Sequence, residues 1–392
     1  MCKVLAALIL ALTASAAAHA AATDFWSQTR RGTNSFNHTE TVAHLVGAKE
    51  FGAGFVRVAI DKWHSESRDF LAGDMDHYDG LVAADAAKLR AILDGAAAHG
   101  VPILVTALGV PGDRWVQHNG DMQDTRIWHD KTWWAAAARY WGDIARTFKG
   151  HKAIAGYDVL NEPVPEWNAG LDDSNDSQVH RDAWCARIKG TARDLYGLYR
   201  AIVAAIRAQD PDVPIVLESG LWSKPMAVRC MEPIVDPHVI YSIHMYEPYA
   251  YTTFRENQGK WRYPGRAPYG GRMYDWDAAA LANWFRPMLD WADAHGIKHD
   301  RLLLGEFGCD RRVEGCAAYL HDVIAAAESA RMHWAFYAFR EDGWDAMDYE
   351  IGSGPTPAGY WDAVVRSEAP NPPHIPNPMA QTLRDALSGP IP

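Results

Sequence analysis

The feature that most constrains the fold is an alternation of short β-rich segments with longer, alanine-rich amphipathic segments. This alternation is typical of βα units that share a parallel sheet. The predicted strands are Gly32–Phe36, Phe55–Ile60, Pro102–Leu108, Ile154–Leu160, Ile215–Ser219, Val239–Tyr246, Leu302–Phe307 and His333–Phe339. The predicted helices are Val42–Phe51, Tyr78–His99, Thr132–Phe148, Ala183–Gln209, Trp276–His295, Gly315–Ala330 and Pro378–Leu387, with a shorter one within Ser223–Met231.

Eight strands, each followed by helical sequence, predict a single-domain (β/α)8 TIM barrel. A doubly wound sheet is the weaker alternative, because no glycine-rich phosphate loop follows the first strand. A barrel places chemistry on the loops at the carboxyl ends of its strands. Two of these loops, 247–275 and 341–377, are long, and long loops in compact domains are often functional.

Aromatic composition also predicts a working surface. The chain has 17 Trp and 16 Tyr but only 11 Phe. Trp and Tyr combine an apolar body with a polar group, so their excess suggests binding surface as well as core. The 247–275 loop is rich in such residues, namely Tyr249, Tyr251, Phe254, Trp261, Tyr263, Tyr269 and Tyr274.

The first twenty residues are predicted to be a secretory signal peptide. Lys3 supplies the positive start, Val4–Thr13 is apolar, and Ala18-His19-Ala20 matches a small-x-small cleavage pattern. A buried N-terminal helix is the alternative. We therefore expect a catalytic domain over 21–392 that is secreted, either extracellular or periplasmic.

Four cysteines follow the predicted cleavage site: Cys185, Cys230, Cys309 and Cys316. An even number in an exported chain predicts two disulfides, with three possible pairings. Proximity favours Cys309–Cys316, which leaves Cys185–Cys230. No CxxC motif is present, so a zinc site is not expected.

The formal net charge of -11, without a basic run, argues against nucleic acid or an anionic membrane as a partner. We expect a monomer that needs no cofactor and no metal.

Two glutamates at strand ends are the strongest catalytic candidates. Glu162 follows the fourth strand in GYDVLNEP, and Glu306 ends the seventh in RLLLGEFG. Each follows an apolar run, so its charge is costly to bury unless it is paired or used. A structural ion pair with a neighbouring strand is the alternative for either one. Paired carboxylates in an aromatic cleft suit glycoside hydrolysis, in which one carboxyl donates a proton and the other stays ionised.

Four motifs in this order resemble glycoside hydrolase family 5. They are FVRVAI with Arg57, GYDVLNEP, the HMY of 244–246, and GEFG. The resemblance covers about Arg31 to Arg340 and implies a (β/α)8 barrel with catalytic glutamates on strands four and seven.

The resemblance implies a role for each matched residue. Glu162 matches the family's general acid/base and Glu306 its nucleophile. Asn161 would bind the sugar 2-hydroxyl. His244 and Tyr246 match the family's His-x-Tyr, and Arg57 would support the nucleophile.

A retaining mechanism is implied, with the two carboxyl groups about 5–5.5 Å apart. The predicted function is a secreted β-glycoside hydrolase, endoglucanase-like, that cleaves β-linked glucan or mannan. An exo-acting β-glycosidase or β-mannosidase with a pocket-shaped site is the alternative. A non-catalytic carbohydrate-binding barrel is a weaker one.

The aromatic positions depart from the family pattern. Trp63, Trp115 and Trp222 follow strands two, three and five and could stack on sugar, although packing of loop against barrel is an equal alternative. The platform under the scissile bond, a Trp in many relatives, would be either Tyr337 or Trp334. Near the strand ends, Glu218 is predicted to pair with Arg57 or another base.

Overall fold

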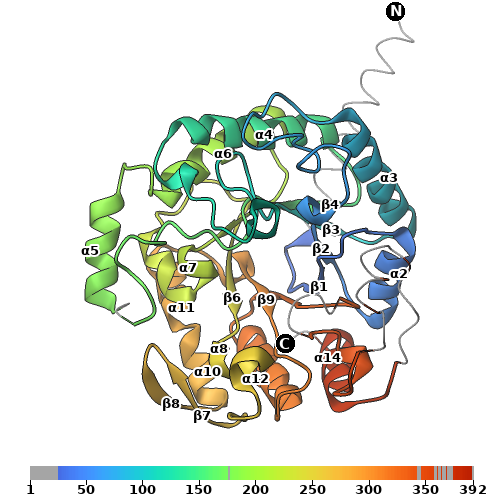
Figure 1. Cartoon of the computed structure of the whole chain (residues 1–392), viewed down its shortest axis with the longest axis vertical. Coiled ribbons are helices and arrows are strands. Elements are labelled where there is room, and N and C mark those ends of the chain that lie inside the picture. The colour runs from blue at the N-terminus through green and yellow to red at the C-terminus, as the bar shows by residue number, and fades with distance from the viewer. Residues whose placement is uncertain are drawn as a thin grey trace, which may run out of the picture.

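Eight short buried strands close into a parallel barrel in the computed structural model (Figure 1). The structure describes residues 25–174, 177–341, 346–356, 360, 363, 368 and 374–390, so the predicted signal peptide lies outside it. The barrel order is β1-β10-β9-β6-β5-β4-β3-β2. The bounds are β1 (Arg31–Ser35), β2 (Val56–Ala59), β3 (Ile103–Thr106), β4 (Ile154–Asp158), β5 (Ile215–Glu218), β6 (Val239–Met245), β9 (Leu302–Phe307) and β10 (His333–Phe336). All eight predicted strands, and the TIM barrel, are confirmed.

Helices surround the barrel, as the alternating pattern predicts (Figure 1). They are α2 (Val42–Phe51), α3 (Ala83–His99), α4 (Thr132–Phe148), α5 (Gln178–Ile188), α6 (Leu195–Gln209), α10 (Ala278–Trp284), α11 (Arg286–Ala294), α12 (Cys316–Ser329) and α14 (Pro378–Ser388). No helix in the described ranges is long and apolar enough to cross a membrane.

Two predicted helices are each divided in the structure. The prediction over Ala183–Gln209 is wrong in its middle, because α5 ends at Ile188 and α6 begins only after Asp194. The Asp194 carboxylate caps α6 by accepting from the backbone N–H of Gly197. The prediction over Trp276–His295 divides into α10 and α11, with Pro287 in the first turn of the second helix. Within Ser223–Met231 the short helix is a 3₁₀ helix over Pro225–Cys230.

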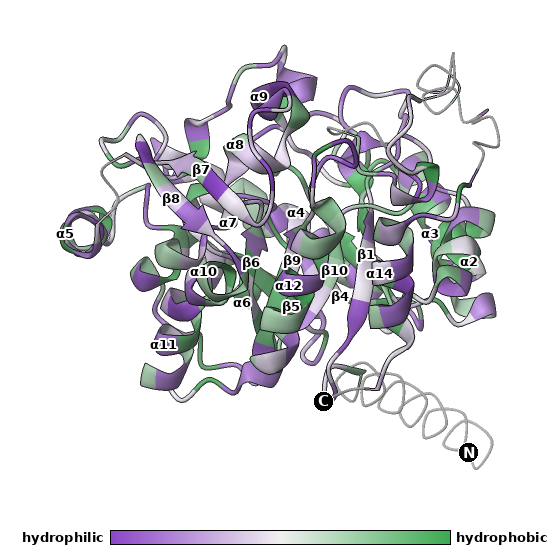
Figure 2. Cartoon of the chain, turned by 90° about the horizontal axis from the view of Figure 1, so that it is seen from below, coloured by the Kyte–Doolittle hydropathy of each residue, from purple (hydrophilic) through white to green (hydrophobic). Residues whose placement is uncertain are grey.

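The aromatic 247–275 loop is more ordered than a plain loop. It contains the short helices α8 (Tyr249–Thr252) and α9 (Phe254–Asn257) and an antiparallel hairpin of β7 (Gly265–Tyr269) and β8 (Arg272–Trp276). Figure 2 shows these elements at one end of the barrel. The rings of Tyr251 and Tyr263 pack against Tyr319 of α12 with centroids 5.7 and 5.5 Å apart, so part of the aromatic excess serves the loop's own core.

The barrel interior changes from apolar to charged along its axis. One end is filled by an apolar cluster that includes Phe55 and Leu303 and is closed by Trp26. Two residues along β2 from Phe55, the side chain of Arg57 is also completely buried. Side chains alternate between the two faces of a strand, so Phe55 and Arg57 point to the same interior. The charged layer therefore lies toward the carboxyl ends of the strands.

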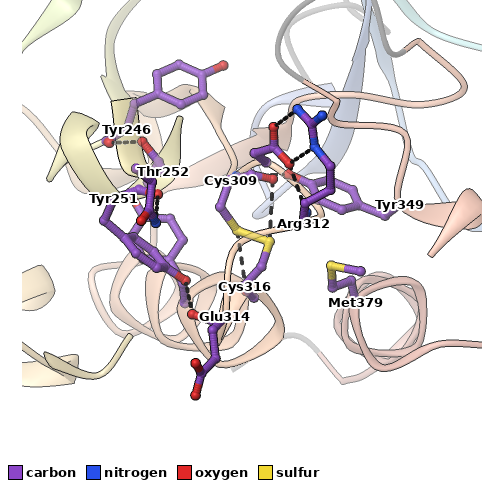
Figure 3. Close-up of a disulfide and its surroundings, with 12 residues drawn as sticks. Tyr246, Tyr251, Thr252, Cys309, Arg312, Glu314, Cys316, Tyr349 and Met379 are labelled. Atoms are coloured by element: carbon purple, nitrogen blue, oxygen red, sulfur yellow. Dashed lines mark hydrogen bonds and ion pairs between the residues drawn. A yellow bond between two sulfur atoms is a disulfide. The ribbon is translucent and has the colours of Figure 1, made fainter. Parts of the chain in front are cut away.

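The two disulfides are Cys309–Cys316 and Cys185–Cys230, the favoured pairing. Figure 3 shows the first of them beside the segment that follows β9. The amide of Cys309 donates to the Tyr349 hydroxyl at 3.0 Å, and the Thr252 hydroxyl donates to the Tyr246 carbonyl at 2.6 Å. These contacts hold in place the segments that follow β6 and β9.

Candidate active site

Glu306, at the carboxyl end of β9, is a buried carboxylate held from two sides. Its Oε1 accepts from Nη1 of Arg57 at 2.5 Å, and its Oε2 accepts from the hydroxyl of Tyr246 at 2.8 Å. The side chain is only 7 % exposed. Both donors fix the orientation of the carboxylate, which is what a nucleophile needs.

Glu162 follows β4 and lies in a different environment. Its backbone adopts a left-handed conformation with φ 49°, which is uncommon for a residue with a side chain. Its Oε1 lies 2.8 Å from Nδ1 of His244, and 27 % of the side chain is exposed. Burial raises the pKa of Glu162 above that of an ordinary glutamate; the charges of Glu306 and Glu218 add to this, while His244 opposes it. A carboxyl that keeps its proton to higher pH suits a general acid.

The two glutamates are close together. One oxygen of Glu162, one of Glu306 and one ring nitrogen of His244 all lie within 4.8 Å of one another. Such a group could in principle hold a divalent cation. The His244 ring and the Glu306 carboxylate are already engaged by Glu162, Arg57 and Tyr246, so a hydrogen-bonded group of side chains accounts for the arrangement.

Arg57 organises the base of this site from the middle of β2. Its guanidinium donates to Asp158 at 2.7 Å, Glu218 at 2.7 Å and Asn161 at 2.7 Å, in addition to Glu306. It also donates to Asn34 on the neighbouring strand β1, at 3.0 Å. The planar guanidinium can satisfy five acceptors at once, which an ammonium cannot.

A cavity of about 580 Å³ lies above these residues and receives side chains from all eight strand ends or the loops after them. Among the predicted site residues, the lining includes Trp115, Asn161, Glu162, Trp222, His244, Tyr246, Glu306 and Tyr337. Arg57 lies beneath it, completely buried.

Two aromatic predictions are resolved by position. Trp63 is 3 % exposed, packs edge-on against Phe70 with centroids 5.3 Å apart, and does not line the cavity. Its proposed sugar contact is therefore corrected to loop packing. Of the two platform candidates, Tyr337 lines the cavity, whereas Trp334 is fully buried behind the strand.

Trp222 reaches the cavity through an unusual turn. Leu221, Trp222 and Ser223 have φ values of 51, 56 and 59°, so α7 (Gly220–Ser223) is a left-handed turn. Such a conformation costs roughly 1–2 kcal/mol per residue with a side chain. The buried Glu166 helps to hold it by accepting from the Leu221 N–H at 3.0 Å.

Sequence reasoning missed the charged residues of the cavity wall. Lys224 is paired with Glu247 at 2.8 Å and with Asp173 at 2.5 Å, while Lys62 lies 3.8 Å from Glu341. Lys62 and Glu247 come within three residues of strand ends, and that position was the available signal. Asn34, at an inward position of β1, was also missed.

Comparisons with known proteins agree with this geometry. The family model "Cellulase (glycosyl hydrolase family 5)" matches residues 18–343. Endoglucanase Z of Dickeya dadantii is 25 % identical over 222 residues, which are 57 % of this chain and 39 % of that protein. The chain thus spans about two fifths of that relative's length.

Solved structures share the fold. The Pseudomonas stutzeri endoglucanase Cel5A in complex with cellobiose has a TM-score of 0.60 at 20 % identity, with 92 % of each chain covered. Thermotoga maritima Cel5A in complex with mannotriose has a TM-score of 0.57 at 15 % identity, with 81 % of this chain and 92 % of that chain covered. Because its family model covers most of the sequence, this chain belongs to glycosyl hydrolase family 5, a family of O-glycosyl hydrolases.

Proposed function

We propose that the protein is a secreted, retaining β-glycoside hydrolase that cleaves β-linked glucan or mannan internally by double displacement. The observation that carries this proposal is the short separation of two carboxylates in unlike environments. A separation below about 5.5 Å suits a nucleophile and an acid/base, whereas an inverting pair needs about 6.5–9.5 Å for an intervening water. One oxygen of Glu162 and one of Glu306 lie within 4.8 Å of each other, which supports the shorter, retaining separation.

In the first step, an oxygen of Glu306 attacks the anomeric carbon while Glu162 gives its proton to the departing glycosidic oxygen. The bond to the leaving sugar breaks and an ester to Glu306 forms. Asn161 uses its amide oxygen to accept from Arg57, so it offers amide N–H groups to the sugar 2-hydroxyl. That contact strengthens as charge develops on the ring.

In the second step, Glu162 removes a proton from water, and the resulting oxygen attacks the same carbon. The ester breaks, Glu306 is released as a carboxylate, and Glu162 is protonated again. The charge of Glu306 raises the pKa of Glu162 in the free enzyme, after the larger effect of burial. Esterification removes this charge, which lowers the pKa of Glu162 when it must act as a base.

The substrate class follows from the cavity wall and from two relatives. The cavity is lined by Trp115, Trp222 and Tyr337, whose faces can stack on sugar rings. One structural relative was solved in complex with cellobiose and another in complex with mannotriose. Export is supported by the predicted signal peptide and by the two disulfides.

An exo-acting enzyme is the second candidate, and the Lys62–Glu341 pair favours it. Lys62 lines the cavity, and a buried ion pair of this kind can bind the hydroxyls of a terminal sugar. Cellohexaose, mannohexaose and aryl β-glycosides distinguish the candidates. Products of mixed length predict endo action, whereas release of single sugars alone predicts exo action.

The stereochemical course is measured on the same substrates by proton NMR. A β-anomer appearing first supports retention, and an α-anomer appearing first overturns it. A Glu306→Ala variant supplies the background, and no hydrolysis of any of these substrates by the unmodified protein would favour a carbohydrate-binding barrel.

A further inference from the structure

Glu218, the last residue of β5, has no role in the two steps above, yet it contacts Glu162 directly and is linked to Glu306 through Arg57. Its Oε1 accepts from Arg57 at 2.7 Å, and its Oε2 accepts from the backbone N–H of Glu162 at 2.7 Å. The side chain is fully buried. Arg57 in turn holds Glu306 at 2.5 Å. One carboxylate therefore joins the backbone of the acid/base to the side-chain support of the nucleophile.

The surroundings of Glu218 consist of hydrogen-bond donors. The hydroxyl of Ser223 also donates to Oε2, and Nε2 of His244 lies 3.2 Å from Oε1. An ionised carboxylate accepts at both oxygens, whereas an amide would present N–H groups to one of these donors. Burial opposes the ionisation of Glu218, but the charges of His244 and Arg57 outweigh it and hold the pKa of Glu218 below its ordinary range.

His244 lies between carboxylates on both of its nitrogens. Nδ1 lies 2.8 Å from Glu162 and 3.8 Å from Glu306, while Nε2 faces Glu218. Only an imidazolium donates from both nitrogens at once. Burial lowers the pKa of His244, but the charges of Glu218 and Glu306 outweigh it and raise that pKa well above the ordinary value.

We infer that Glu218 is a positioning residue that keeps His244 charged beside Glu162 and fixes the left-handed backbone of Glu162 relative to the Arg57–Glu306 pair. The inference rests on the proposed function for the roles of the two glutamates. The part of the inference that concerns the ionisation of His244 does not depend on the proposed function. Glu218 itself touches neither substrate nor the reacting atoms.

The charges around Glu218 determine how strongly its substitution should change the pKa of His244. Glu218, Glu306 and Asp158 surround a single guanidinium, so a second positive charge or a bound proton is needed for balance. Burial and the charge of Glu218 raise the pKa of Asp158, so Asp158 holds a proton more readily than an ordinary aspartate. The titratable groups that face Glu218 are Arg57 on β2, Asp158 on β4, Glu162 after β4, His244 on β6 and Tyr199 on α6. Glu306 on β9 faces Arg57 and His244.

The test follows the Cε1 proton of His244 by NMR in histidine-labelled protein, with the signal assigned by its loss in a His244→Gln variant. In the unmodified protein His244 is expected to titrate well above the ordinary histidine pKa of about 6.5. In Glu218→Gln its pKa should fall by about 1–3 units, which is the usual effect of a close opposite charge. The same variant should lose about 10–100-fold in kcat, with a smaller change in KM.

Asp85→Asn is the matched control. Asp85 is also buried and accepts a backbone N–H, from Leu71 at 2.9 Å, and a hydroxyl, from Ser65 at 2.7 Å, but it contacts neither the catalytic pair nor the cavity wall. We expect this variant to lose stability while the titration of His244 and kcat stay within about twofold.

Equal effects of the two substitutions on the His244 titration and on kcat would overturn the inference and leave Glu218 with a structural role only. If Glu218→Gln does not fold, the unmodified protein still decides, because a His244 that titrates at or below about 6.5 would contradict it. Failure of the proposed function would look different from failure of this inference. It would appear as missing hydrolysis or an inverted product while the pKa of His244 stayed high.

Discussion

The floor and the rim of the cleft are built in different ways. The floor, defined as Arg57, Asp158, Glu218, His244 and Glu306, stands on barrel strands, and none of its residues is more than 5 % exposed. The rim, comprising Trp115, Trp222, Lys224, Tyr249 and Lys62, stands on loops and short turns, where Trp222 reaches 38 % exposure and Tyr249 37 %. Strands fix the reacting groups, while the loops are free to vary with the substrate.

The largest expected effect comes from breaking the floor. An Arg57→Met substitution leaves Glu306, Glu218 and Asp158 without their shared cation. Removing one partner of a buried ion pair costs about 3–5 kcal/mol. We expect this loss in urea unfolding, together with a fall in kcat/KM of at least about 10³-fold.

Arg57→Lys is the control, since it keeps the charge but not the planar donors. It should recover part of the stability and little of the activity. Equal activity in Arg57→Lys and the unmodified protein would show that the floor needs only a charge.

The disulfides separate the stability of the two regions. Cys185–Cys230 closes a loop of 45 residues at the periphery, and Cys309–Cys316 closes one of 7 just after Glu306. Loop entropy predicts losses of about 4 and about 2 kcal/mol when each pair is replaced by serine. Replacement of Cys309–Cys316 should also lower kcat, because the loop that it closes supports the end of β9 (Figure 3).

Thermal unfolding and kcat are measured on both double variants. A larger fall in kcat on replacement of Cys185–Cys230 than on replacement of Cys309–Cys316 would contradict this expectation.

The pH profile tests how the floor tunes Glu162. The acid must be protonated to act, and its raised pKa extends the active range upward. For a natural glucan, kcat/KM should therefore fall about tenfold per pH unit above a pKa that lies higher than the ordinary value of about 4.3.

Glu162→Gln should lose this alkaline limb on aryl glycosides whose leaving group departs without a proton. An alkaline limb at or below about pH 4.3 in the unmodified protein would contradict the assignment.

The smallest expected effect is on the rim. Trp222→Ala removes an exposed ring that lines the cavity. We expect KM to rise about 3–10-fold, which is roughly 0.7–1.4 kcal/mol, with little change in kcat or in the free energy of unfolding. Trp222→Phe should restore most of the affinity, and an unchanged KM in both variants would place this ring outside the substrate path.

The same division explains what the sequence could predict. Glu162 and Glu306 follow apolar runs at strand ends, and Arg57 lies within the apolar strand β2, so these three could be placed together from the order of the strands. The rim could be predicted only in part, as Trp115 and Trp222, because loop paths depend on contacts between distant segments. Trp63 turns into the core, and Trp222 reaches the cavity through a left-handed turn that no local residue preference favours.

The position of Glu218 in the floor could not be predicted in full, because it depends on contacts between distant parts of the chain. Glu218 was expected to pair with Arg57, and it does, but its bond to the backbone of Glu162 joins residues 56 positions apart. The one predicted helix over Ala183–Gln209 failed for a related reason, since its break depends on the Asp194 cap rather than on hydrophobic period.

Azide rescue distinguishes the nucleophile from the acid/base, which we propose to be Glu306 and Glu162. Glu306→Ala and Glu162→Ala are each incubated with a dinitrophenyl β-glycoside and azide, and the glycosyl azide is identified by NMR. We predict an α-azide from Glu306→Ala, because azide attacks the substrate directly, and a β-azide from Glu162→Ala, because azide attacks the glycosyl-enzyme. The opposite pairing of anomers, or the same anomer from both variants, would contradict it.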